Sequence, residues 1–215
     1  MLIEEARWLN QVLGEIGPER GWRLLDVGSS TEYFRRVEQP YIDYYVFWPL
    51  RKLGVEIVHV DSRNDEGVDI TCDISDPASQ EAVEEIPPAD VVLCSNLLEH
   101  VLDREMVAGR LALLTKPGGY LIVTVPHVYR YHEDPIDTLY RPTNKQLEAL
   151  FPSGDFQAVR SEILYVDCGY LDVPSSPVAY ILFRLRRFIR LRIRKRPVKF
   201  DRCKVSVVVL KKSTA

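Results

Sequence analysis

The chain has 215 residues, of which 46% are hydrophobic and 27% are charged, so it can bury one sizeable core and lacks the composition of disordered or collagen-like proteins. No run of about 18 apolar residues occurs, and the N-terminus mixes acidic with apolar residues, so we expect neither a membrane-spanning helix nor a signal peptide. The small net charge of −3 fits a single domain over residues 1–215.

The first fifth of the chain predicts a helix followed by a buried strand. Apolar residues recur at helical spacing over residues 2–16, and Gly17 and Pro18 end the run. The next apolar run is short and stops at Gly28, which is typical of a strand buried on both faces of a parallel sheet. Strands of this kind are predicted at Trp22–Val27, Val55–Val60, Asp90–Cys94 and Tyr120–Val125, with a shorter one at Val68–Thr71.

Helices alternate with these strands. Apolar residues from Leu102 to Leu114 keep helical spacing, and Lys116–Gly119 reads as the end of that helix. Thr143–Phe151 predicts another helix, and Ile163–Val166 and Lys204–Leu210 predict two late strands. Alternation of this kind predicts right-handed strand–helix–strand units and an open parallel sheet, in which ligands bind beyond the carboxyl ends of the strands.

Polar residues follow successive predicted strands. Gly28 lets the backbone approach a ligand closely, and the Asp61 carboxylate can accept hydrogen bonds from two ribose hydroxyls. Asp73 and Ile74 follow the short third strand, where an acid can accept from an adenine amine. An aspartate after a strand is more often a turn former or a cap. The ordered set nevertheless favours a nucleoside site.

With these residues in place, the sequence resembles class I S-adenosylmethionine-dependent methyltransferases of the small-molecule and glycan type. The resemblance covers residues 22–151, the expected core cofactor-binding region. It lies in the stretches LLDVGSS, IVHVDS, TCDISDP, ADVVLCSNLLEHV and LLTKPGGYLIVTVPH. It implies a Rossmann-like α/β fold, with a seven-stranded, mostly parallel sheet, helices on both faces and the last strand antiparallel.

The resemblance also implies S-adenosyl-L-methionine as the cofactor and a set of residues that bind it. The methionine moiety falls to the loop after the first strand, the ribose to the second strand and the adenine to the third. The implied residues are Asp26, Gly28, Ser29, Ser30, Asp61, Asp73, Ile74, Ser95, Asn96 and Leu97.

Two features depart from the family pattern. Ser30 and Glu32 stand where the family's loop usually carries its second and third glycines. An aromatic-rich stretch, Glu38–Pro49, lengthens the connection between Gly28 and Asp61. This insertion either packs as an extra helix or loop on the sheet edge, or forms a lid or acceptor wall near the cofactor.

Candidate bases follow the Tyr120–Val125 strand. A hydroxyl acceptor needs a group that removes its proton, and we expect His132, His127 and Asp134 to be catalytic, with Asp134 orienting the His132 imidazole. His127 could instead bond the backbone locally, and His100 could cap a turn or pack against the cofactor. His127, His132 and Asp134 could also hold a metal, but no helical histidine pair supports this, and we expect none.

The cysteines support the same expectation. Cys72, Cys94, Cys168 and Cys203 show neither C-x-x-C nor cysteine–histidine spacing, so we expect neither a metal site nor disulfides. Unpaired cysteines are typical of a reducing compartment, and we expect a cytoplasmic protein.

The basic residues are concentrated in one segment. Tyr180–Arg202 contains ten basic residues and one acid, a net +9, and leaves −12 on the rest of the chain. Residues 179–202 form a basic amphipathic segment inserted before the last strand. The segment could be solvated or paired with acids elsewhere, or could contact an anionic membrane surface peripherally. The −12 on the rest of the chain argues against nucleic acid.

The sequence therefore predicts methyl transfer to an oxygen or nitrogen of a small-molecule or saccharide-like acceptor. Two alternatives stand beside this interpretation. The altered glycine loop is compatible with a non-catalytic relative that keeps the fold. A nicotinamide-dependent oxidoreductase would need further glycines after Gly28.

Overall fold

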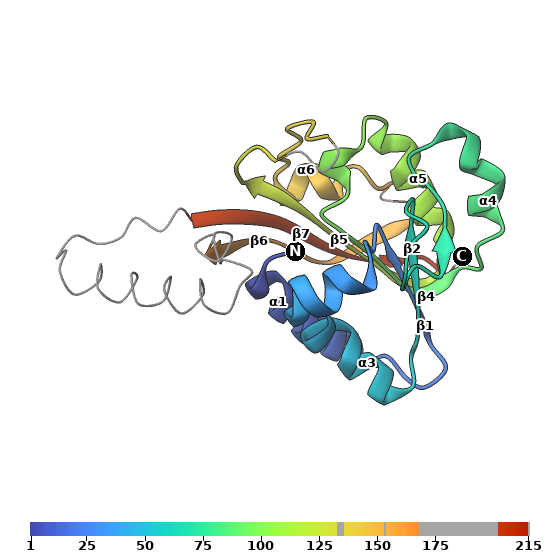
Figure 1. The fold of residues 1–215 in the computed structure, drawn as a ribbon. Coiled ribbons are helices and arrows are strands. Elements are labelled where there is room, and N and C mark those ends of the chain that lie inside the picture. The colour runs from blue at the N-terminus through green and yellow to red at the C-terminus, as the bar shows by residue number, and fades with distance from the viewer. Residues whose placement is uncertain (133–135, 153, 168–201, 215) are drawn as a thin grey trace, which may run out of the picture.

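One mixed sheet runs through the molecule, in the order β3-β2-β1-β4-β5-β7-β6 (Figure 1). The structure is a computed structural model that describes residues 1–132, 136–152, 154–167 and 202–214. The strands β1 to β5 pair in parallel, whereas β7 runs antiparallel to both of its neighbours, β5 and β6. The strands are β1 (Arg23–Val27), β2 (Glu56–Asp61), β3 (Ile70–Thr71), β4 (Ala89–Ser95), β5 (Thr115–Val128), β6 (Phe156–Asp167) and β7 (Arg202–Lys212). The predicted seven-stranded sheet with an antiparallel last strand is confirmed.

Helices cover both faces of this sheet. α1 and α3 lie on one face, and α4, α5 and α6 lie on the other (Figure 1). The α-helices are α1 (Ile3–Ile16), α2 (Pro40–Ile42), α3 (Trp48–Leu53), α4 (Gln80–Glu84), α5 (Arg104–Leu114) and α6 (Asn144–Glu148). Short π-helical segments, η1 (Phe34–Glu38) and η2 (Asp43–Phe47), and 3₁₀ turns, η3 (Pro77–Ser79) and η4 (Leu98–His100), complete the chain's helical elements in the described residues.

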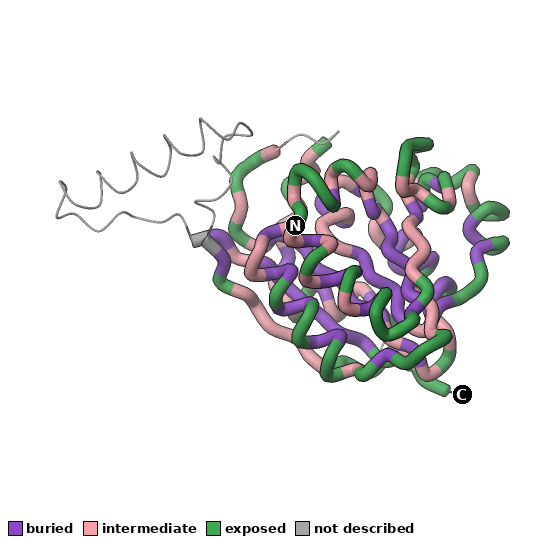
Figure 2. The backbone as a smooth tube through the Cα atoms, turned by 60° about the horizontal axis from the view of Figure 1, so that its bottom comes forward, coloured by how far each residue is buried: buried purple, intermediate pink, exposed green. Residues whose placement is uncertain are grey.

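Two apolar layers hold the helices to the sheet, because successive side chains of a strand point to opposite faces. Leu24 of β1 packs in the layer beneath α1, whereas Leu25 packs in the layer beneath α5. The central strands are therefore buried on both sides, and exposed backbone lies at the periphery (Figure 2). This double burial explains why the sequence of each central strand is a short continuous apolar run.

The insertion Glu38–Pro49 is helical. It forms α2, η2 and the start of α3, and its residues Ile42, Val46 and Phe47 are buried in the same layer as α1. The prediction of an extra packed helix is confirmed for these residues. Gln39, at the start of the insertion, lines the cavity described below.

The segment Lys116–Gly119 differs from the prediction. The helix α5 ends at Leu114, and β5 begins directly at Thr115 with a register irregularity opposite β4. Lys116 therefore does not stand in the last turn of a helix; its Nζ contacts the Asp90 carboxylate at 2.9 Å. Gly119 is required here, because a Cβ would lie 2.9 Å from the Asp90 carbonyl oxygen.

Some predicted features lie outside the described residues, namely Asp134, Cys168 and the basic segment Tyr180–Arg202 as far as residue 201. Within the described ranges, no helix is long and apolar enough to cross a membrane. The expectation for the cysteines is wrong at one position: Cys203 is disulfide-bonded, whereas Cys72 and Cys94 are free and buried. The disulfide of Cys203 was not predictable from motif spacing.

Candidate functional site

A cavity of about 520 Å³ opens beyond the carboxyl ends of β1, β2 and β4. This is where ligands bind in open α/β sheets, and the volume lies in the range of small-molecule sites. Eight of the nine residues named next were expected from strand ends and one, His132, from the loop after β5. The predicted site residues that line the cavity are Gly28, Ser30, Asp61, Asp73, Ile74, Ser95, Asn96, Leu97 and His132.

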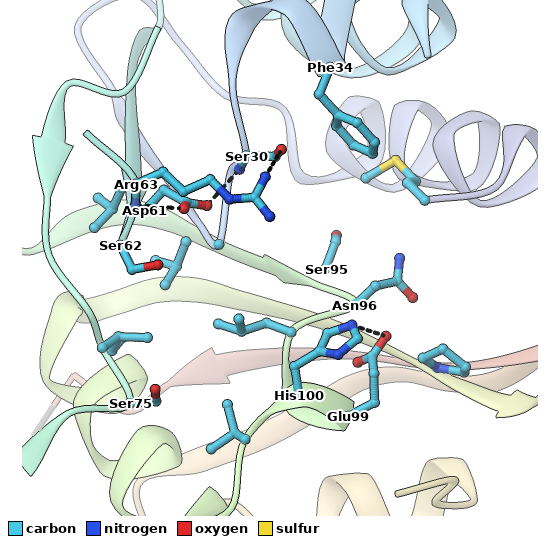
Figure 3. Close-up of a pocket in the computed structure, with 18 of the residues that line it drawn as sticks. Ser30, Phe34, Asp61, Ser62, Arg63, Ser75, Ser95, Asn96, Glu99 and His100 are labelled. Atoms are coloured by element: carbon cyan, nitrogen blue, oxygen red, sulfur yellow. Dashed lines mark hydrogen bonds and ion pairs between the residues drawn. The ribbon is translucent and has the colours of Figure 1, made fainter. Parts of the chain in front are cut away.

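The loop after β1 is fixed by backbone geometry and by Asp61. Gly28 has a φ of 75°, and a Cβ there would meet Leu97 Cδ1 at 3.1 Å, so glycine suits the close turn. Ser30 also has a positive φ, 56°, which explains why the family often places glycine here. The Ser30 backbone N–H donates to Asp61 Oδ2 at 2.7 Å (Figure 3). Asp61 thus links the first two strand ends.

Arg35, on η1, holds the same loop through hydrogen bonds to its carbonyl oxygens. Its guanidinium is buried and donates to the carbonyl oxygens of Ser29 (2.9 Å), Ser30 (2.5 Å) and Gly67 (2.6 Å). Burial lowers the pKa of Arg35 from its ordinary value, although neighbouring acids, Asp26 foremost, oppose the shift. In this loop, which lacks the second and third glycines of the family pattern, the buried Arg35 guanidinium fixes the backbone by binding three carbonyl oxygens.

The third strand end supplies a polar and an apolar wall. Asp73 is exposed, and its Oδ1 accepts hydrogen bonds from the backbone N–H and hydroxyl of Ser75 at 2.8 and 2.7 Å. Ile74 is buried, and its carbonyl oxygen accepts from Arg110 on α5 at 2.8 Å. The pair presents an acid beside an apolar side chain, an arrangement that suits a purine edge and face.

Asn96 is held by an acid from the N-terminal helix. It has a φ of 52°, and its Nδ2 donates to Glu5 Oε1 at 2.9 Å. Glu5 is fully buried, accepts from the Thr124 hydroxyl at 2.5 Å and also caps α1 through the Leu2 backbone N–H. Glu5 therefore fixes α1 to the ends of β4 and β5 and keeps the Asn96 turn in place.

Asp26 and Ser29 do not line the cavity. The Asp26 carboxylate lies 2.9 Å from His59 Nδ1, its register partner on β2, so the two side chains join the strands below the cavity. Ser29 is buried, and its hydroxyl donates to the Ser30 carbonyl oxygen at 3.1 Å. Both residues shape the loop from behind.

Of the residues expected to be catalytic, Asp134 lies outside the described residues, and only one of the two histidines reaches the cavity. His132 lines the cavity, whereas His127 does not: its Nδ1 lies 3.0 Å from the carbonyl oxygen of Pro142, a backbone contact with a residue 15 positions along the chain rather than a local one. The acid that the structure places beside His132 is Asp137, whose Oδ2 lies 3.3 Å from Nδ1. Burial lowers the pKa of His132, so the neutral imidazole is favoured.

Glu99, a buried acid that the sequence analysis did not name, lies close to His132 in the cavity wall. Glu99, on η4, is fully buried, and burial raises its pKa to about 8. Figure 3 shows Glu99 and His100 directed toward each other, away from Ser30 and Asp61. His100 thus lines the cavity, which is compatible with the alternative that it packs against the cofactor.

Phe34, Gln39 and Tyr129 also line the cavity and were not predicted. Gln39 belongs to the insertion Glu38–Pro49, so the insertion forms part of the wall as well as packing in the layer of α1; Phe34 precedes it on η1. Tyr129 follows β5, and its ring lies 5.2 Å from the His132 ring. Its place after a strand end was the only available signal.

The comparisons with known proteins agree with this geometry. A family model described as a methyltransferase domain matches residues 4–161. No curated protein matches the chain in sequence.

Similar solved structures include two that are named as methyltransferases and one that is not. Coclaurine N-methyltransferase bound to N-methylheliamine and SAH has 14% identity and a TM-score of 0.55, with 95% of this chain and 70% of that chain covered. The 1,6-didemethyltoxoflavin-N1-methyltransferase of Burkholderia thailandensis, with bound 1,6-didemethyltoxoflavin and S-adenosylhomocysteine, has 16% identity and a TM-score of 0.51, with 97% and 78% covered. The MccD protein has 13% identity and a TM-score of 0.56, with 99% and 100% covered. At such identities the likeness shows the fold.

Proposed function

Because the chain belongs to the methyltransferase domain family, we propose that it transfers a methyl group from S-adenosylmethionine to an oxygen or nitrogen of a small-molecule or saccharide-like acceptor. One observation carries this proposal. A single cavity collects Gly28, Asp61 and Asn96 from the ends of the neighbouring strands β1, β2 and β4 at one side and His132 at the other. Family membership favours this proposal over the nicotinamide alternative.

The cofactor end of the cavity suits a nucleoside with an amino-acid moiety. The two carboxylate oxygens of Asp61 can accept about four hydrogen bonds. In the described part of the chain, the carboxylate accepts two, from the backbone N–H groups of Ser30 and Arg63. Two positions remain for ribose hydroxyls. Asp73 and Ile74 supply an acceptor and an apolar surface for adenine. When bound, S-adenosylmethionine supplies the methyl group on a sulfonium.

The acceptor end lies around Tyr129, His100 and His132. Methyl transfer depends chiefly on alignment, and well-oriented groups reach effective molarities of about 10⁵–10⁸ M. His132 contributes a neutral imidazole to the cavity wall, and Tyr129 packs edge-on against it. These side chains therefore position an acceptor and provide a lone pair toward its proton.

Calorimetric titration with S-adenosylmethionine tests the proposal. We expect saturable binding of one equivalent, and no comparable binding of NAD⁺. Absence of heat with S-adenosylmethionine, measured on folded protein, would overturn the proposal. Release of S-adenosylhomocysteine with panels of small amines, phenols and saccharides then identifies the acceptor. Binding without release on any panel would favour the non-catalytic alternative.

The basic segment and the location of the protein remain predictions from the sequence. Tyr180–Arg202 carries a net +9, which suits peripheral contact with an anionic membrane surface. Sedimentation with phosphatidylglycerol vesicles tests this contact, and it should weaken steeply with added salt. Equal sedimentation with neutral vesicles would contradict it. The expected cytoplasmic location is tested by imaging a tagged protein.

A further inference from the structure

Glu99 is a buried carboxylate whose oxygens lack hydrogen-bond partners. Both oxygens are shielded from solvent and have no hydrogen-bond partner in the described part of the chain, yet the residue lines the cavity. Buried carboxylates are normally paired or bound to a metal. Its surroundings therefore call for a cationic occupant.

Two imidazoles lie beside this carboxylate. His100 Nε2 is 3.8 Å from Glu99 Oε1, and the His100 and His132 rings are 5.1 Å apart and nearly perpendicular. One ligand atom from each of Glu99, His100 and His132 lies within 4.8 Å of the other two. Three donors of these types thus converge on one small volume, although His132 is distant from the pair in sequence.

The other nitrogen of each imidazole is held by an oxygen. His100 Nδ1 forms a short hydrogen bond with the Ile136 carbonyl oxygen. His132 Nδ1 lies 3.4 Å from the Arg130 carbonyl oxygen and 3.3 Å from Asp137 Oδ2, and Asp137 also accepts from Arg141 at 2.6 Å. Histidines that bind metals almost always donate the remaining ring N–H to a carbonyl or carboxylate in this way. Both rings are therefore set in the tautomer that leaves Nε2 with a lone pair.

We propose that Glu99, His100 and His132 form a binding site for a divalent transition-metal cation such as Zn²⁺. Two imidazoles and one carboxylate are a known ligand set for catalytic Zn²⁺ and for other first-row metals, with the remaining positions open. Tetrahedral ligands at about 2.1 Å from a metal are roughly 3.4 Å apart, so small side-chain rotations close the site. No metal site was expected from the sequence. The proposed ligands were not recognised there because two come from a short turn and the third from a loop far along the chain.

Resting on the proposed function, the site also indicates the class of acceptor. A bound cation lowers the pKa of a coordinated hydroxyl and orients it, so hydroxyl-bearing acceptors with a chelating oxygen fit best. With the cation present, His132 would hold the metal, and the coordinated hydroxyl, with its lowered pKa, would release its proton to solvent before methyl transfer.

The test titrates the chelator-stripped full chain with ZnCl₂ by calorimetry and records the visible spectrum with CoCl₂. We expect one equivalent to bind, with a raised unfolding temperature and cobalt bands of a four- or five-coordinate site. Glu99→Gln and His132→Asn should each weaken binding by at least about tenfold. The matched control His127→Asn, a histidine of the same segment outside the cluster, should bind as the wild type does.

Failure to bind either metal, or unchanged binding in folded Glu99→Gln, would overturn the proposal. Unfolding curves without metal show whether each variant is folded. Stabilisation of the wild type by methylammonium in place of the metals would also overturn it and identify an ammonium group as the occupant. Because S-adenosylmethionine is absent from these titrations, their failure leaves the proposed function to its own test.

Discussion

Substitution of Asp61 separates its two tasks at the cofactor end. Its Oδ2 accepts from the Ser30 N–H at 2.7 Å and its Oδ1 from the Arg63 N–H at 3.0 Å, and its remaining lone pairs face the proposed ribose. Asp61→Ala removes the charged acceptor and frees the loop. Hydrogen bonds to charged groups are worth about 1.5–3 kcal/mol, so the Kd for S-adenosylmethionine should rise by roughly 10- to 150-fold.

Asp61→Asn refines this prediction. The amide oxygen can still accept from Ser30, so the loop keeps its shape while the charge and one acceptor are lost. We expect an intermediate Kd, weakened by about tenfold. Isothermal calorimetry measures both variants, with Asp65→Ala, a nearby exposed acid outside the cavity, as the matched control. An unchanged Kd in folded Asp61→Ala, or equal weakening in Asp65→Ala, would refute the ribose assignment.

Three further substitutions test the supports of the site. Arg35→Met removes a buried cation from three carbonyls and should lower the free energy of unfolding in urea by about 2–4 kcal/mol; exposed Arg36→Met should cost far less, and equal losses would contradict the brace. Gly28→Ala imposes a left-handed φ costing about 1–2 kcal/mol and crowds Leu97; both the unfolding temperature and cofactor affinity should fall, and wild-type values would show that the turn tolerates a Cβ. Desolvation would raise the pKa of Asp90, but hydrogen bonds from the Arg23 N–H and Lys116 outweigh it and lower the pKa. The ionised Asp90 therefore stabilises the folded protein above the unfolded pKa of about 3.9, and this contribution is lost as pH falls through the lower folded pKa. Asp90→Ala should therefore lose about 1–3 kcal/mol at pH 7 and less near pH 3; a loss independent of pH would argue against the ionised form.

The fold was predictable where burial leaves a local pattern. Strands such as β1 and β4 are covered on both faces, so their sequences are short apolar runs that end at turn residues. The start of β5 was not predictable in this way. Lys116–Gly119 has the composition of a helix stop, and only the pairs on either side of it, Thr115 with Ala89 and Tyr120 with Val91, place it within a strand.

The candidate site was predictable at the strand ends and not beyond them. Gly28, Asp61 and Asn96 follow directly from strand positions, because parallel strands deliver their carboxyl ends to one edge. Arg35 and Glu5 act through contacts with residues far along the chain or through loop carbonyls, and their sequence context shows only a charged residue on a helix. His127 and His132 could not be ranked, because the path of the loop after β5 decides which one reaches the cavity.

Glu99 is a further site residue that could not be predicted from its neighbours in the sequence. In the sequence it is one acid in a short turn, and neither its full burial nor its lack of hydrogen bonds has a local signal. Its proximity to His132 depends on the loop that returns from β5 across η4. The structure therefore adds an acceptor-side cluster to a cofactor side that the strand ends had already indicated.

A crystal structure with S-adenosylhomocysteine would locate the cofactor site. We expect the ligand in the cavity beyond β1, β2 and β4, with both ribose hydroxyls within about 2.6–3.2 Å of the Asp61 carboxylate. We also expect adenine beside Asp73 and Ile74 and the sulfur directed toward the side that carries Tyr129 and His132. Ligand density at any other surface, or a ribose away from Asp61, would contradict this assignment of the cofactor site.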